Sequence, residues 1–143
     1  MSKLYDFLNP VSTTEEREVV ISKRFVQRGP DGEPILDADG NMMPRPFKIR
    51  AITQQENDAI IKACKRKVKG EDVLDTVELS HRLVVTATLD PDFRDTELCE
   101  HFGTMNPYDV PAKMLLSGEY SKLMQEINDL SGFNDDAESE AKN

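Results

Sequence analysis

The chain has 143 residues and a mass of 16.2 kDa, which is enough for one compact domain with a modest core. Its 18 basic and 27 acidic residues give a formal net charge of −9, which opposes binding to nucleic acid or to anionic lipid. No stretch approaches the roughly 18 apolar residues of a membrane span, and residues 1–4 begin no signal peptide. We therefore expect a cytoplasmic protein that does not bind membranes.

The N-terminal third of the chain predicts strands. Segments 18–28 and 46–52 alternate apolar and polar residues with a period of two, which is typical of paired antiparallel strands. Between them, residues 29–45 are rich in Gly, Pro and Asp, which predicts a long excursion rather than a tight turn. Residues 1–17 predict a loosely attached arm. The apolar face of the two strands would comprise Val19, Ile21, Phe25, Phe47, Ile49 and Ala51.

After residue 52 the spacing of apolar residues changes to that of helices. Thr53 and Glu56 fit the capping box, in which each side chain accepts from an otherwise unpaired backbone N–H of the other residue. They predict a helix that begins at Thr53 and ends near Gly70. Asp75 predicts the start of a second helix, although the β-branched run at 84–86 leaves a strand as the alternative there.

Three further helices are predicted from their end signals. Asp95 can cap a short helix that ends at Gly103, and Asn106, followed by Pro107, can begin the next one. Ser117 can begin the last helix, with a glycine just after its end at position 132.

The acidic segment 134–143 cannot bury apolar area, so we expect it to be a disordered tail. The remaining residues, 1–133, are predicted to form a single domain. Its fold class is α+β, with a small antiparallel β-element at the N-terminal side followed by about five α-helices.

The last predicted helix carries a regular apolar stripe, which has two interpretations. At helical spacing such a stripe forms one face, and that face either packs in the core or covers the apolar surface of a partner. Both interpretations remain open from the sequence. The residues of this stripe, our candidate partner-binding residues, are Tyr120, Leu123, Met124, Ile127 and Leu130.

Sites for chemistry are scarce in the sequence. Cys64, His81, Cys99 and His101 could ligate zinc but lack the paired spacing of known zinc sites, and the Cys99–His101 pair points apart on a helix. No catalytic, cofactor-binding or metal-binding residue is therefore predicted. Residues 62–69 hold five cations and suit either contact with nucleic acid or the C-terminal end of a helix, where cations stabilise the helix dipole. We favour the helix end.

A series of short segments occurs along the chain in a fixed order: Lys48 to Thr53 with Glu56 and Asn57, Asp90 to Phe93, Gly103, Met114 to Leu116, Gly118 to Tyr120 with Leu123, and Leu130 to Phe133. In their order and separations these segments resemble the XkdN-like tail assembly chaperones of tailed phages and defective prophages. The resemblance covers roughly residues 15–143. Two departures are a longer excursion at 29–45 and a serine at position 117, where the family often has proline.

The resemblance implies a small, non-enzymatic chaperone without cofactor. Such chaperones coat the tape measure protein, keep it soluble and yield it as tail tube subunits polymerise around it, and they are absent from the mature virion. Two alternatives are a structural tail or connector component and a small nucleic-acid-binding regulator that uses residues 62–69. Whether the chain forms a homo-oligomer is left open.

Overall fold

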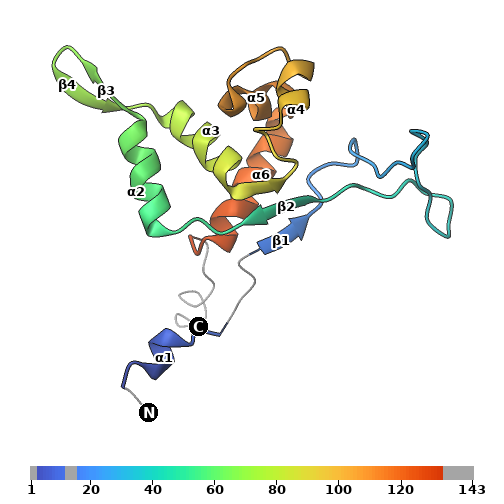
Figure 1. Cartoon of the computed structure of the whole chain (residues 1–143), viewed down its shortest axis with the longest axis horizontal. Coiled ribbons are helices and arrows are strands. Elements are labelled where there is room, and N and C mark those ends of the chain that lie inside the picture. The colour runs from blue at the N-terminus through green and yellow to red at the C-terminus, as the bar shows by residue number, and fades with distance from the viewer. Residues whose placement is uncertain (1–2, 12–15, 134–143) are drawn as a thin grey trace.

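The structure, a computed structural model, describes residues 3–11 and 16–133 (Figure 1). These residues form a three-stranded sheet, a bundle of helices and two projecting elements, which are the segment between the first two strands and a hairpin at residues 65–74. The fold class is therefore α+β, as predicted. The predicted disordered tail at 134–143 lies outside the described residues. Within the predicted N-terminal arm, residues Tyr5–Leu8 form a one-turn helix, α1, and its apolar side chains are exposed.

The sheet has the strand order β1-β2-β5, and both pairings are antiparallel. Strand β1 is Glu16–Val19, β2 is Phe47–Arg50 and β5 is Thr88–Asp90. In β2 the apolar residues Phe47 and Ile49 are buried while the alternate charged residues are half-buried, which is the pattern of a sheet with one face on the core.

The first strand is much shorter than the predicted span of 18–28. Pairing with β2 ends at Val19, although Ile21 remains buried and Phe25 packs against Phe47 with 5.6 Å between ring centroids. Lys23 is the one charged residue in the apolar register, and the backbone turns at this point, where Ser22 Oγ accepts from Arg24 N–H. The alternation of apolar residues therefore continues beyond the hydrogen-bonded strand.

The excursion between β1 and β2 extends away from the sheet, as Figure 1 shows. It folds back on itself through isolated bridges between Val26 and Pro44 and between Leu36 and Met42. Two of its turns place glycines at positive φ, Gly32 at 84° and Gly40 at 82°, which glycine adopts without steric cost. The predicted long excursion is confirmed.

Helix α2, Gln54–Ala63, begins at the predicted cap but ends earlier than predicted. The Thr53 hydroxyl accepts from Glu56 N–H at 3.2 Å, and the Glu56 carboxylate accepts from Thr53 N–H at 3.1 Å. The predicted helix end near Gly70 is wrong, because residues 65–74 form a hairpin.

This hairpin consists of β3, Lys65–Val68, and β4, Glu71–Leu74, in antiparallel register. Its two-residue turn has φ of 53° at Lys69 and 81° at Gly70. Positive φ at both central residues is the signature of the type I′ turn, whose twist matches that of the paired strands. Since Gly70 permits this turn, the chain reverses here instead of extending the helix.

The remaining helices follow the predicted caps. Asp75 accepts from Glu78 N–H at the start of α3, Thr76–Ala87, so the helical alternative is correct for residues 84–86. Asp95 caps α4, Thr96–His101. The predicted fourth helix divides into a 3₁₀ turn, Pro107–Asp109, and α5, Val110–Met114, before α6, Ser117–Leu130.

The core lies between the sheet and the helices. Helix α6 packs on β1, β2 and α3, and α3 also contacts α2, α5 and the 3₁₀ turn. The fully buried side chains are almost all aliphatic, as the absence of Trp requires. The largest of them are Phe93, Ile49, Leu123, Ile127, Val84, Val85 and Val110.

A bidentate ion pair fastens the excursion to α6. The Arg24 guanidinium donates to both carboxylate oxygens of Glu119, at 2.6 and 2.9 Å, and Glu119 also accepts from Leu116 N–H. The Glu119 residue is 9% exposed. The hydrogen bonds from Arg24 hold the pKa of Glu119 at about 2, below its usual 4.5.

We expect Thr53→Ala to lower the free energy of unfolding by roughly 1 kcal/mol, because it removes the acceptor for Glu56 N–H. Urea unfolding measures the change. Thr53→Ser, which keeps the hydroxyl, is the matched control and should unfold close to wild type. An unchanged midpoint for Thr53→Ala would contradict the role of the cap.

The Arg24–Glu119 pair also predicts a pH dependence. Because the pKa of Glu119 is lower in the folded than in the unfolded chain, its contribution is present above about pH 4.5 and is lost as pH falls toward 2. Glu119→Gln should therefore be less stable than wild type at pH 7, and the difference should shrink between pH 4.5 and 2. The exposed Glu100→Gln is the control. A difference that stays constant with pH would refute this assignment.

Candidate partner-binding surfaces

The apolar stripe of α6 faces the interior. Leu123 is 0% and Ile127 1% exposed, and both belong to the core. Tyr120, Met124 and Leu130 are half-buried against that core. The five residues thus lie on one face of α6, as predicted, and in the structure that face packs against the sheet and α3.

Tyr120 shows how firmly this face is held. Its hydroxyl lies 2.6 Å from the Ser80 hydroxyl on α3, and its ring meets the His81 ring edge-on at 5.9 Å between centroids. Burial raises the pKa of Tyr120 above 10. Binding of a partner by Leu123 and Ile127 stays a prediction, and it requires α6 to leave the sheet.

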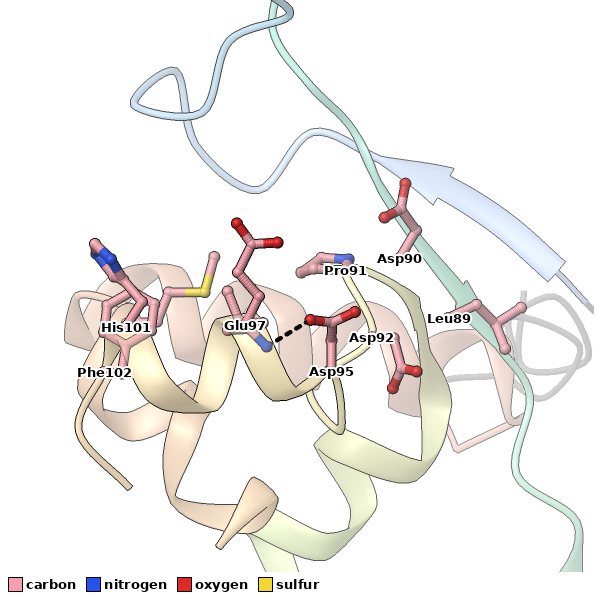
Figure 2. Close-up of a pocket in the computed structure, with 10 residues that line it drawn as sticks. Leu89, Asp90, Pro91, Asp92, Asp95, Glu97, His101 and Phe102 are labelled. Atoms are coloured by element: carbon pink, nitrogen blue, oxygen red, sulfur yellow. Dashed lines mark hydrogen bonds between the residues drawn. The ribbon is translucent and has the colours of Figure 1, made fainter. Parts of the chain in front are cut away.

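An open groove of about 600 Å³ lies between the end of β5 and α4 (Figure 2). Leu98 of α4, Phe102 directly after α4 and Met114 of α5 supply apolar side chains, all half-buried. Because these side chains pack on the core from one side and line the groove on the other, they offer apolar surface to a partner without any change of fold.

Carboxylates surround this groove. Asp90 pairs with Arg45 at 2.6 Å, and Asp92 and Asp95 each accept from a backbone N–H in the turn before α4 and at its cap. Glu97 projects above the cap in Figure 2. Among the described residues, Asp92, Asp95 and Glu97 make no ion pair. The groove therefore suits an apolar side chain that is flanked by Lys or Arg.

The basic run 62–69 is a second charged surface, and its location differs from our expectation. We interpreted it as the end of a helix, but only Lys62 and Ala63 belong to α2, and the run continues into β3 of the hairpin. The cations therefore lie on an exposed strand and its turn, where most of them are remote from the helix dipole.

The cysteines and histidines do not come together. Cys64 is buried where α2 ends, whereas Cys99 is buried in α4 and donates its thiol to the Phe93 carbonyl at 3.4 Å. His101 stacks edge-on against Phe102 at 4.8 Å. Within the described ranges no group of three or more His, Cys, Asp or Glu side chains could hold a metal ion.

Sequence reasoning missed the groove, because local patterns do not show how the successive elements β5, α4 and α5 pack against one another. The segment Asp90 to Phe93 was prominent only as part of the family resemblance, and Asp95 only as a helix cap. The spacing of the apolar residues Leu98 and Phe102, four residues apart and so on one side of a helical turn, was the one local signal.

Comparison with known proteins places the chain in a family. Residues 4–142 match the family described as phage XkdN-like tail assembly chaperone protein. The uncharacterized protein YqbN of Bacillus subtilis strain 168 is 36% identical over 146 residues, which cover 95% of this chain and 90% of YqbN. The phage-like element PBSX protein XkdN of the same strain is 34% identical over 153 residues, covering 98% and 95%.

A solved structure agrees with the sequence match. The crystal structure of YqbN superposes with a TM-score of 0.64 at 31% identity, and the match covers 90% of this chain and 95% of that one. The chain therefore belongs to the XkdN-like family of phage tail assembly chaperones. In the part of the chain that the structure describes, no helix is both long and apolar enough to span a bilayer.

Truncation of the α6 stripe should be costly. Leu123→Ala removes a completely buried side chain, so we expect the free energy of unfolding to fall by roughly 2–5 kcal/mol. The neighbouring exposed Lys122→Ala is the control and should change it by less than about 0.5 kcal/mol. If Leu123→Ala unfolds like wild type but no longer co-purifies with tail proteins, the stripe is a binding face instead.

Proposed function

We propose that this protein binds the tape measure protein of a tailed phage or prophage, keeps it soluble and helps tail tube subunits to polymerise around it. The observation that carries the proposal is the family match over residues 4–142, nearly the whole chain. The proposed role is binding without catalysis, and it needs no cofactor. Its partners are then the tape measure protein and the tail tube protein, in the cytoplasm of the host.

The surface of the molecule supports this role. A protein that holds another chain in solution needs apolar area for the client and net charge for the complex. The groove beside α4 supplies apolar side chains for the client, and the net charge of −9 would help to keep the complex in solution. We infer that the groove accepts apolar side chains of the client that are flanked by cations.

A structural tail or connector component is the alternative within the same biology. The two roles differ in what remains after assembly, because a chaperone is released whereas a structural protein stays in fixed stoichiometry. A nucleic-acid-binding regulator is the third hypothesis, and the exposed cations of the β3–β4 hairpin are the observation that favours it. Its affinity would fall steeply with salt through counterion release.

Co-expression with the cognate tape measure protein tests the proposal. We expect the tape measure protein to be insoluble alone, and soluble and co-purified when this chain is present. Purified mature tails should lack the chain. Its presence there in fixed stoichiometry would replace the proposal by the structural alternative.

The groove is tested by one charge reversal. Glu97→Lys lies in its lining and should reduce the amount of co-purified client, whereas Glu100→Lys makes the same change on the same helix outside the lining. Equal retention of client by both variants would show that binding uses another surface, while leaving the chaperone role itself intact.

A further inference from the structure

The β3–β4 hairpin is a projecting element without a core of its own. It continues from the end of α2, away from the sheet (Figure 1), and all four residues of each strand are exposed. Val68 is 45% and Val73 41% exposed, and the register places them diagonally on one face. Since a two-stranded hairpin is marginally stable in water by itself, a segment that covers it would stabilise it.

The run 62–69, which leads into this hairpin, carries five cations and no carboxylate. Arg66 pairs with Asp75 and Lys67 with Asp72, each at 3.2 Å. The other cations of the run, Lys62, Lys65 and Lys69, form no ion pair with any described residue. Lys65 pairs in register with Leu74, so it lies on the face of the hairpin opposite to the two valines. The charge of these ammonium groups therefore favours an acidic ligand.

Such a segment exists in the same chain. Residues 134–140 hold four carboxylates, those of Asp135, Asp136, Glu138 and Glu140, and contain no cation. They directly follow Phe133, which is 68% exposed. Their charge is therefore complementary to the hairpin.

The segment starts close enough to reach the hairpin. Ile52 N–H donates to Ser131 Oγ at 2.9 Å, so the end of α6 lies beside the start of α2. The 10 residues of α2 span about 15 Å, because an α-helix rises about 1.5 Å per residue. Seven extended residues reach at most roughly 25 Å. The carboxylates at 136–140 can therefore lie beside Lys62 and Lys65 at the far end of α2.

We propose that the acidic segment 134–143 docks beside the base of the β3–β4 hairpin of the same chain, with its carboxylates paired to the ammonium groups of Lys62 and Lys65. In the docked state these cations are neutralised within the molecule. A polyanion that binds the hairpin must then displace the segment, which keeps this surface from non-specific contact with nucleic acid.

A spin label on the segment tests the contact in the full-length protein. Both native cysteines are buried, so Ser139→Cys supplies the accessible thiol for the label. At low salt we expect loss of NMR peak intensity at the amides of residues 62–74. The loss should disappear in 1 M NaCl, where the Debye length is about 3 Å. Broadening confined to other surfaces, or no broadening, would overturn the proposal.

Charge variants of the labelled protein make the test specific. Lys62→Gln with Lys65→Gln should abolish the broadening, whereas Lys113→Gln with Lys122→Gln removes the same charge elsewhere and should preserve it. Equal broadening in the two double variants would refute the assignment of Lys62 and Lys65 as the cations that hold the segment. The last control mixes spin-labelled chains that carry no ¹⁵N with ¹⁵N-enriched chains that carry no spin label. In this mixture we expect no broadening of the amide peaks of the ¹⁵N-enriched chains. Broadening there would assign the segment to a second copy and overturn docking within one chain.

Discussion

Burial of one face of α3 is the constraint on which the rest of the structure depends. Val84, Val85 and Ala87 are 0% exposed, and the helix contacts α2, α5, α6 and the 3₁₀ turn. With no Trp and few aromatic residues, the core must gain its stability from close aliphatic packing around this helix. The end of α3 is fixed as well, because the buried Thr88 hydroxyl donates to the Val84 carbonyl at 2.7 Å where the chain enters β5.

Ion pairs then position the parts that the core cannot hold. Beyond the apolar contacts of Ile21 and Phe25, the excursion between β1 and β2 is held by Arg24–Glu119 and Arg45–Asp90, which connect its two ends to α6 and to β5. The first pair is half-buried and bidentate, so it contributes more than a typical exposed ion pair. The excursion consequently starts and ends at fixed points while its middle extends from the sheet.

Local signals in the sequence were sufficient for most of the elements. The caps at Thr53, Asp75 and Asp95 placed three helix starts correctly, because a cap is a contact between residues two or three apart. The hairpin at 65–74 was missed because helical spacing of apolar residues was followed beyond the true helix end at Ala63 as far as Gly70. Strand β5 was missed because three residues are too few to show a period.

The candidate sites were harder to predict for a different reason. A stripe at helical spacing is the same whether it packs in a core or meets a partner, so the periodicity of α6 could not decide between these roles. The decision depends on α3 and the sheet, through contacts between residues far apart in the sequence. The groove beside α4 was hidden for another reason, since the spacing of apolar residues does not show how the successive elements β5, α4 and α5 pack against one another.

The use of the α6 stripe in the core bears on how a chaperone of this kind would release its client. If α6 stays in place, the groove is one apolar surface left for a client, and the side chains of Leu98, Phe102 and Met114 in its lining are half-buried already. Small contact areas give weak and transient complexes, and carboxylates around an apolar floor favour fast association with a basic client. In the proposed role, many weak contacts along a long client would together hold it in solution, whereas each single contact would yield readily to a polymerising tail tube. A deep, strongly apolar cleft would bind more tightly and would oppose that release.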